Sequence, residues 1–167
     1  IRLVGDSQGG RRVMPHIHKK IDFTVGAFIT HENRVLLVRH KELKMWLSVG
    51  GHIELDEDIE QALYREIEEE SGLKSPEIEI LAEKPDINDP DSKSLFTPSY
   101  VDIHKINDRH RHIVFVYFVK SKTGAVKLAG DEHHEIRWFT EKELDDPKYQ
   151  LIPKIKFYAK KALMRGR

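Results

Sequence analysis

The sequence carries three glutamates whose spacing would bring their carboxylates together on one helix. Glu69 and Glu70 follow Glu66 by three and four residues, and such positions are neighbours on a helix surface. Glu66 and Glu70 lie in line with an apolar stripe that includes Leu63, whereas Glu60 points elsewhere. Carboxylates that are crowded and partly buried repel one another, so a divalent cation such as Mg²⁺ or Mn²⁺ would stabilise them.

Two features near the glutamates would help to hold such a cation. Gly50 and Gly51 permit a backbone turn that brings carbonyl oxygens toward an ion held by the helix. Arg65 can pair with Glu69 or reach back to Glu57, but one guanidinium does not neutralise three glutamates. The alternative interpretation is an ordinary glutamate-rich helix whose charged face lies in solvent. The apolar stripe and the paired glycines favour the metal site.

The elements that must position these residues follow from hydrophobic patterning. A helix is predicted from about Asp58 to Ser71, with Gly72 as a left-handed stop. Thr140 followed by Glu143 predicts a capping box that opens a short helix. Strands are expected at about 21–30, 35–39, 78–81, 100–106, 113–119 and 135–139, a strand or extended loop at 46–53, a loop at 85–98, and a last helix at 151–164. The pattern predicts one mixed α/β domain.

The helix and the segment before it resemble the Nudix box, G-x5-E-x7-R-E-U-x-E-E-x-G-U, in which U is an apolar aliphatic residue. Residues 51–73 read GHIELDEDIEQALYREIEEESGL and agree at every fixed position. These positions are Gly51, Glu57, Arg65, Glu66, Ile67, Glu69, Glu70, Gly72 and Leu73. A chance match in a chain of ordinary composition is rarer than about one in a million. The chain is therefore identified as a member of the Nudix hydrolase family.

This resemblance implies a fold and a reaction class. The fold is an α/β/α sandwich with a mixed sheet, formed as a single domain by residues 14–167. The reaction is the hydrolysis of a nucleoside diphosphate linked to another moiety, with Mg²⁺ or Mn²⁺ as the cofactor. One departure from the family is Val49, where many members have proline before the two glycines. Its loss relaxes the loop and removes no chemical group.

By resemblance, the box residues divide into two groups. The metal-binding group consists of Glu66, Glu69, Glu70 and the carbonyl of Gly50. Glu57 and Arg65 brace the loop against the helix, and Arg65 orients Glu66. Gly51 and Gly72 are structural positions. Water attacks phosphorus in line, and the metal neutralises the developing charge on the phosphate oxygens.

The proton acceptor is either Glu66 or a glutamate outside the box. Glu132 and Glu135, in the segment GDEHHEIRW, are the outside candidates. The order Glu132-His133 before an Arg-Trp pair is similar to that in some diadenosine tetraphosphate hydrolases of the family. Glu132 is therefore the first choice for an accessory base or ligand, and an exposed loop acid is the alternative.

A second set of polar residues alternates along a predicted strand. Arg109 and Arg111 flank His110 and precede His112, an arrangement suited to contacting substrate phosphates. The alternative is a solvated strand end. The chain holds ten histidines, but their spacing along the sequence does not support a zinc site.

Composition limits the classes of partner. The 28 basic and 28 acidic residues balance, so no dedicated nucleic-acid partner is expected. The longest apolar run, 113–119, is far shorter than the roughly 20 residues of a membrane helix. The absence of cysteine fits a reducing cytoplasm. Residues 1–13 have no useful periodicity, and an added or processed leader is expected there, with a disordered tail as the alternative.

Two function classes are compatible with the box. A hydrolase needs the carboxylates, whereas a non-catalytic Nudix-like module that only binds a nucleotide or a protein does not need three of them. Dinucleoside polyphosphates, modified nucleoside triphosphates, nucleotide sugars and capped RNA ends all remain open as substrates. Trp46 and Tyr100 are candidates to stack on a base, with a core position as the alternative. The oligomeric state leaves no signature in the spacing.

Overall fold

The centre of the structure is one seven-stranded sheet. The computed structural model describes residues 17–128 and 133–167. The strands are β1 (Ile21–His31), β2 (Arg34–His40), β3 (Trp46–Leu47), β4 (Ile78–Ile80), β5 (Tyr100–Asn107), β6 (His110–Ser121) and β7 (His133–Thr140). Their order is β3-β2-β1-β6-β4, with β5 also paired to β6 and β7 to β2. The β1–β6 pair is parallel and the other pairs are antiparallel, so the predicted mixed sheet is confirmed.

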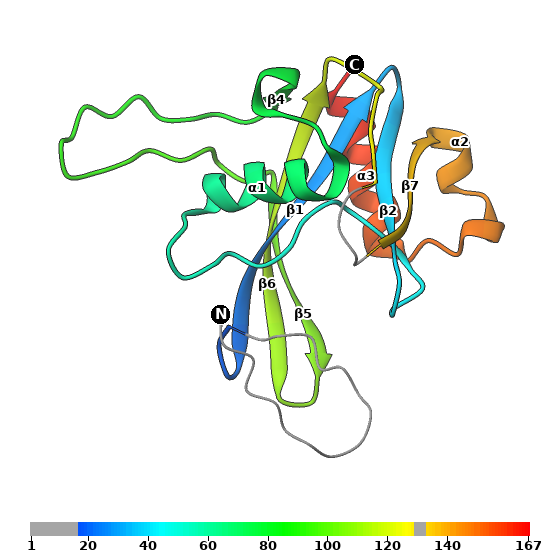
Figure 1. The fold of residues 1–167 in the computed structure, drawn as a ribbon, viewed down its shortest axis with the longest axis horizontal. Coiled ribbons are helices and arrows are strands. Elements are labelled where there is room, and N and C mark those ends of the chain that lie inside the picture. The colour runs from blue at the N-terminus through cyan, green and yellow to red at the C-terminus, as the bar shows by residue number, and fades with distance from the viewer. Residues whose placement is uncertain (1–16, 129–132) are drawn as a thin grey trace.

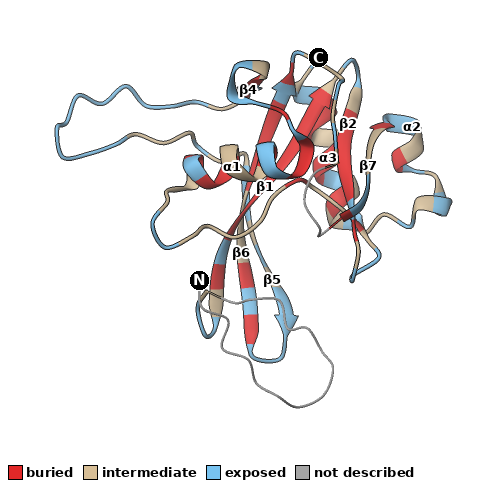
Figure 2. Ribbon diagram, in the orientation of Figure 1, coloured by how far each residue is buried: buried red, intermediate tan, exposed pale blue. Residues whose placement is uncertain are grey.

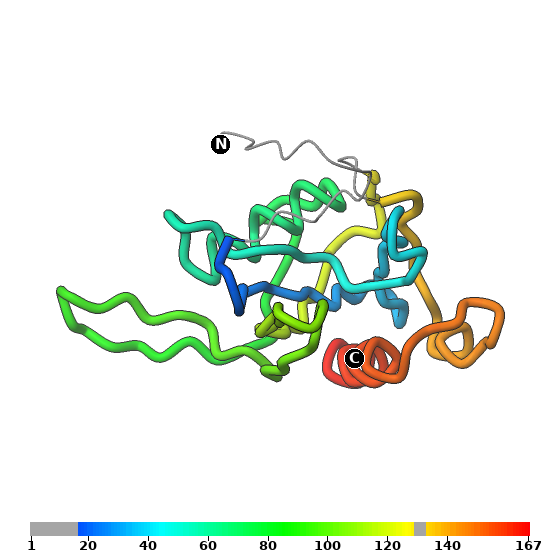
Figure 3. Tube along the Cα trace, turned by 90° about the horizontal axis from the view of Figure 1, so that it is seen from below, coloured from blue at the N-terminus to red at the C-terminus, as the bar shows by residue number. Residues whose placement is uncertain are grey.

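Helices cover the two faces of this sheet (Figures 1 and 3). Helix α1 (Ile59–Ser71) lies on one face, and α3 (Pro153–Arg165) lies on the other. The short helix α2 (Glu141–Leu144) follows β7, and 3₁₀ turns occur at Ser75–Glu77 and Pro147–Tyr149. The expected single-domain α/β/α sandwich is therefore confirmed. None of the helices in the described part of the chain is long and apolar enough to cross a membrane.

Alternation along the strands separates the core into two clusters. Val25, Ala27 and Ile29 of β1 pack in one cluster with the α1 residues Ala62, Leu63 and Ile67. Phe28 packs in the other cluster, with Tyr158 and Ala159 of α3. Successive side chains of a strand point to opposite faces, so odd-numbered β1 residues lie on what we call the α1 face and even-numbered ones on the α3 face.

The sheet extends beyond the region that the helices cover. At one end, Glu32 and Asn33 form the β1–β2 turn with φ values of 45° and 59°, as a tight hairpin turn requires. At the other end, β1 and β6 remain paired down to the register Ile21↔Arg111. This end projects past both helices, and it carries both buried and exposed residues (Figure 2).

The segment between β4 and β5 contains no helix or strand, as predicted for residues 85–98, and it projects from one side of the fold (Figure 1). Its two ends return to the beginning of α1. The Lys84 Nζ donates to Glu60 Oε2 at 2.8 Å, and the Phe96 backbone N–H donates to Glu60 Oε1 at 2.7 Å. Glu60 is consequently buried, although the helical pattern alone placed it away from the apolar stripe.

Most predicted element boundaries are close to those observed. The segment predicted as a strand or extended loop at 46–53 forms only the short β3, followed by isolated bridges at Val49 and His52. The leader predicted at residues 1–13 lies outside the described residues.

Candidate active site

Helix α1 is fixed at both ends by its own sequence. The Asp58 side chain accepts hydrogen bonds from the backbone N–H groups of Glu60 and Gln61, and Gln61 completes a capping box. Gly72 ends the helix in the left-handed conformation at φ 73°. Both ends agree with the prediction to within one residue, so the positions of the glutamates on the helix are determined locally.

The carboxylates of Glu66 and Glu70 lie against the paired glycines. The Gly50 N–H donates to Glu70 Oε2 at 2.9 Å. A Cβ atom at Gly51 would lie only 2.3 Å from Glu66 Oε1, so the absence of a side chain at Gly51 makes room for that carboxylate. The Glu66 and Glu70 side chains are 12% and 9% exposed, whereas Glu69 is 59% exposed. The helix therefore presents two nearly buried acids and one solvated acid.

Arg65 connects the helix to the loop that leads into it. Its guanidinium makes a bidentate contact with Glu57 and donates to Glu66 Oε1 at 2.7 Å and to Glu69 Oε2 at 3.1 Å. It also donates to the His52 carbonyl at 2.9 Å. These contacts join the loop, the helix and the Glu66 carboxyl, and the bracing and orienting roles of Arg65 and Glu57 stay predictions.

The electrostatics of the site differ from one acid to the next. Burial raises the pKa of Glu66 to about 7, and the negative charges of Glu70 and Glu69 add to this, against the lowering effect of Arg65. Hydrogen bonds from Arg65 hold the pKa of Glu57 below its ordinary value. Arg65 therefore lowers the pKa of both carboxyls, but at Glu66 the effect of burial is larger.

The donor atoms of these residues and their burial show whether the site fits a divalent cation. The donors are carboxylate oxygens, which suit Mg²⁺ or Mn²⁺, and burial, which raises the pKa of Glu66, makes its ionised form costly without an added cation. The chemistry of the set therefore fits such an ion. Within the described residues, however, the glutamates of the box do not bring three ligand atoms within 4.8 Å of one another. For Gly50 the observed contact is its N–H with Glu70, and the carbonyl as a ligand stays a prediction.

His133 is a site residue that the sequence reasoning missed in this role. Its Nε2 contacts Glu70 Oε1, and its ring packs edge-on against His40 with centroids 5.6 Å apart. His133 is buried, whereas the adjacent His134 is exposed, as alternation along β7 requires. No spacing in the sequence connects residue 133 with residue 70, because the contact depends on the pairing of β7 with β2.

The remaining predicted site residues lie away from these contacts or outside the described chain. Glu132 falls outside the described residues, so its role as an accessory base or ligand stays a prediction. Glu135 is exposed and pairs with Arg39 on β2. Arg109 and Arg111 are exposed at the β5–β6 hairpin, and their contact with substrate phosphates also stays a prediction.

Several other polar and aromatic candidates lie on the α3 face. Trp46 is buried against Phe139, and Tyr100 contacts the Tyr158 ring of α3. His110 and His112 share a strand face, as expected, but they are buried. Burial lowers the pKa of His112 to about 4, assisted by the neighbouring His52 and His104. These side chains are therefore on the opposite side of the sheet from α1.

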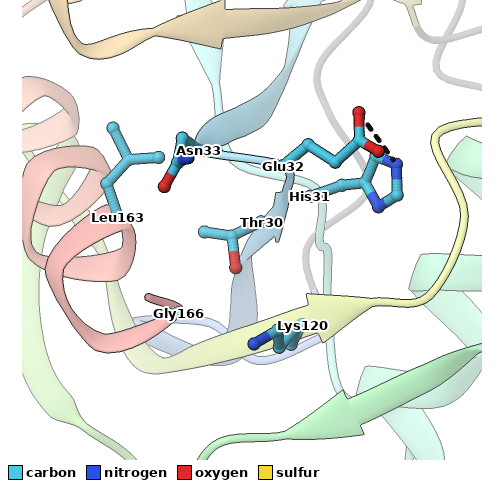
Figure 4. Close-up of a pocket in the computed structure, with 7 residues that line it drawn as sticks. All are labelled: Thr30, His31, Glu32, Asn33, Lys120, Leu163 and Gly166. Carbon is cyan, nitrogen blue, oxygen red and sulfur yellow. Dashed lines mark ion pairs between the residues drawn. The ribbon is translucent and has the colours of Figure 1, made fainter.

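A small hollow at the far end of β1 is separate from the box (Figure 4). It lies at the β1–β2 turn beside the end of α3, where Thr30, His31, Lys120 and Gly166 are among the residues that line it. None of the box glutamates contributes to its lining. The hollow is therefore no extension of the carboxylate site.

Comparison with known families agrees with this geometry. The model of the NUDIX domain matches residues 20–161. The ADP-ribose pyrophosphatase of Methanocaldococcus jannaschii is 27% identical over 146 residues, which cover 78% of this chain and 75% of the relative. The chain belongs to the Nudix hydrolase family.

Solved structures of Nudix proteins share the fold. A NUDIX-family hydrolase from Clostridium perfringens superposes with a TM-score of 0.72 at 28% identity, covering 86% of this chain and 96% of that one. The NUDIX domain of Shewanella oneidensis NrtR, solved in complex with ADP ribose, gives a TM-score of 0.58 at 21% identity. That second alignment covers 92% of this chain and 94% of the other.

Proposed function

We propose that this protein hydrolyses the pyrophosphate bond of a nucleoside diphosphate linked to another moiety, in a reaction that depends on Mg²⁺ or Mn²⁺. The observation that carries the proposal is the seating of Glu66 and Glu70 against Gly50 and Gly51, beside the guanidinium of Arg65. Two nearly buried carboxylates at one place are costly unless a cation accompanies them. A pyrophosphate substrate also requires that cation.

Each residue has a part in the proposed chemistry. Glu66, Glu69, Glu70 and the Gly50 carbonyl would hold the divalent ion, which supplies charge neutralisation at the phosphate oxygens and a lowered pKa for water. The Arg65 guanidinium keeps Glu66 in place. The water oxygen bonds to phosphorus as the anhydride P–O bond opposite it breaks, and the water proton passes to a carboxylate, either Glu66 or Glu132. The leaving phosphate departs as the second product.

For the substrate class, ADP-ribose and related nucleoside diphosphate sugars are the first candidates. The M. jannaschii relative is named an ADP-ribose pyrophosphatase, and the NrtR domain was solved with ADP ribose. These names support testing ADP-ribose and related sugars first. Dinucleoside polyphosphates, modified nucleoside triphosphates and capped RNA would be tested in the same way.

An aromatic surface beside the box suits the nucleoside part of such a substrate. Phe23 is 42% exposed, lies on the α1 face and stacks with Phe115, with ring centroids 6.4 Å apart and an interplanar angle of 16°. The Phe23 carbonyl accepts the Ile53 N–H at 2.9 Å, so this surface adjoins the loop of the box. Bases stack favourably on exposed aromatic rings, and we propose Phe23 for this contact.

The test is a phosphate-release screen of the full chain over these substrate classes, with Mg²⁺ and with Mn²⁺. Turnover of at least one nucleoside diphosphate derivative is expected. On that substrate, Glu70→Gln should lower kcat/KM by about 100-fold or more, because it removes one of the two nearly buried charges. Glu68→Gln, an exposed position on the same helix, is the matched control and should retain the rate. Full activity in Glu70→Gln would overturn the site assignment.

The competing class is a non-catalytic module that binds a nucleotide. Tight binding of ADP-ribose without turnover under any divalent metal would favour it. The presence of all three box glutamates favours catalysis, since nucleotide binding alone does not require them. A cytoplasmic location, expected from the cysteine-free sequence, stays a prediction.

A further inference from the structure

A second group of ligand-type side chains gathers away from the box glutamates. Asp22, His52 and His112 each offer one ligand atom, and these atoms all lie within 4.8 Å of one another. Asp22 is fully buried and His112 is 6% exposed, while the His52 side chain is 20% exposed. Two imidazoles and one carboxylate therefore converge at one place, although the residues are far apart in the sequence.

Strand register explains the convergence. Asp22 of β1 is paired with His112 of β6, and His52 forms an isolated bridge with Thr24, two residues along β1. Paired residues in adjacent strands project to the same side of a sheet. Asp22 and Thr24 are even-numbered β1 residues, so all three ligand groups lie on the α3 face. Asp22 and His112 are paired near the ends of β1 and β6 that project beyond the helices (Figure 1).

Surrounding groups hold Asp22 in position. The backbone N–H groups of Ile17 and His18 donate to its two oxygens at 3.1 Å and 2.6 Å. His52 Nε2 and His110 Nε2 both lie near Asp22 Oδ2, at 3.3 Å and 3.2 Å. A carboxylate oriented by backbone donors, with imidazole nitrogens around it, is typical of a metal ligand supported by its neighbours.

We propose that Asp22, His52 and His112 bind a divalent transition metal of the zinc class, with His110 adjacent to the ion. Imidazole nitrogen together with a carboxylate is a ligand set for Zn²⁺, whereas Mg²⁺ prefers oxygen ligands alone. The ligand atoms lie within 4.8 Å of one another, and two ligands at about 2.0–2.2 Å from one Zn²⁺ lie at most about 4.4 Å apart, so small side-chain movements would let them share one ion.

The position of this site gives it a structural role next to the box. The carbonyl of His52 accepts a hydrogen bond from Arg65 Nη2 at 2.9 Å, and His52 immediately follows Gly51. An ion bound to the His52 ring would fix this loop to β1 and β6 on one face of the sheet. On the other face, the same loop carries the contacts of Gly51 and Gly50 with Glu66 and Glu70. The ion would thus brace the loop without joining the reaction.

Calorimetric titration of the chelator-treated full chain with Zn²⁺ tests the proposal. The titration is made in a Glu70→Gln background, which weakens metal binding at the box, and one high-affinity Zn²⁺ per chain is expected. His52→Gln and His112→Gln should each weaken that binding by about 100-fold or more, since even residues that only support ligands cost 10–100-fold. Co²⁺ in place of Zn²⁺ should give the intense visible absorption of a four-coordinate site that contains imidazole.

A neighbouring histidine is the matched control. His104 packs against His112, with ring centroids 5.7 Å apart, but its Nδ1 is engaged by Asp102 and Lys154. His104→Gln should therefore keep the Zn²⁺ affinity. The proposal is overturned if the chain with intact histidines binds no Zn²⁺, if His52→Gln binds it unchanged, or if His104→Gln loses it equally. Because His52 is partly exposed, its variant decides the matter even if His112→Gln fails to fold.

Discussion

The two faces of the sheet carry two clusters of ligand-type side chains that differ in charge. On the α1 face, Glu66, Glu69 and Glu70 bring three carboxyl groups, and the Arg65 guanidinium contacts Glu66 and Glu69. On the α3 face, a single carboxylate, Asp22, stands among imidazoles. Within the described residues, only the histidine cluster gathers three ligand atoms within 4.8 Å. Imidazole rings can approach one carboxylate, whereas three carboxylates repel one another.

The comparison teaches that the two clusters differ in how far the protein alone has assembled them. Burial raises the pKa of Glu66 to about 7, so its ionised form is costly where it lies. Under the proposed function, a hard divalent ion and a phosphate substrate would complete the glutamate cluster. The histidine cluster is already assembled, so its proposed ion would reinforce geometry that the strand register has set.

Among the tests of this comparison, the largest effect is expected from filling the space beside Glu66. In Gly51→Ala the new Cβ would meet the Glu66 carboxyl at 2.3 Å, so the carboxylate must move. Displacement of a reacting group by about 1 Å can cost 100-fold, and we expect kcat/KM to fall by about 100-fold with a normal circular dichroism spectrum.

The matched control lies on the α3 face. In Gly26→Ala the Cβ would meet only Ser48 Oγ at 3.1 Å and Val114 Cγ1 at 3.4 Å. This change should reduce stability by about 1–3 kcal/mol and leave the rate per folded enzyme nearly unchanged. Equal rates for Gly51→Ala and the parent chain would show that Glu66 does not need its observed position.

The two faces should also respond to different metals. At a concentration about 100 times its Kd, an ion stabilises the folded chain by about 2.7 kcal/mol, which corresponds to about 5–10 °C in Tm for a chain of this size. Mg²⁺ should raise the Tm of Asp22→Asn but not of Glu70→Gln, and Zn²⁺ should do the reverse. Thermal melting of both variants in each metal checks the prediction, and an identical response to both metals would contradict the separation.

A smaller effect concerns the bracing pair Glu57–Arg65. The pKa of Glu57 is held below its ordinary value of 4.5, chiefly by the hydrogen bonds from Arg65. A lowered carboxyl pKa stabilises the folded state above the unfolded-state value, and this contribution is lost as the pH falls through the folded-state pKa. Glu57→Gln should therefore lower the free energy of unfolding by about 1–3 kcal/mol near neutral pH. The difference in this free energy between the variant and the parent chain should shrink below about pH 4.5.

Denaturant unfolding at several pH values measures this difference. Glu68→Gln is the control, because residue 68 is exposed on the same helix. The account is contradicted if the difference in free energy of unfolding between Glu57→Gln and the parent chain stays constant from neutral to acid pH. The Glu57–Arg65 pair would then contribute nothing through charge.

The smallest effect is expected at the proposed base contact. Phe23→Ala removes the ring that stacks with Phe115 on the α1 face. Such stacking contributes about 0.5–1.5 kcal/mol, so KM should rise by about 2- to 10-fold while kcat changes little. Phe157→Ala, an exposed ring on α3, is the control on the other face. A fall in kcat with constant KM would contradict a binding role for Phe23.

The sequence predicted local features well. Asp58 and Gly72 begin and end α1 as expected, because capping and left-handed stops depend on adjacent residues. The contact between Arg65 and Glu57 is also local, because the two residues are only eight positions apart in the sequence. The mixed sheet and the layers came from strand patterning together with the box resemblance.

Contacts between distant segments were not predictable in this way. Glu60 is buried because the segment from Lys84 to Phe96 returns to the helix, and no helical pattern contains that information. The contact between His133 and Glu70 depends on β7 pairing with β2. Likewise, histidine spacing gave no reason to expect zinc, since His52 and His112 meet only through the register of β1 with its neighbours.

The central claim is that the carboxylates on the α1 face perform the hydrolysis. The most direct test is the steady-state rate of Glu66→Gln in saturating Mg²⁺, on the best substrate of the screen, compared with Glu68→Gln. Glu66 is nearly buried and contacts Arg65. Glu68, two residues further along the same helix, is exposed. The account predicts a loss of about 1,000-fold for Glu66→Gln and a nearly unchanged rate for Glu68→Gln. Equal rates for the two variants would contradict it.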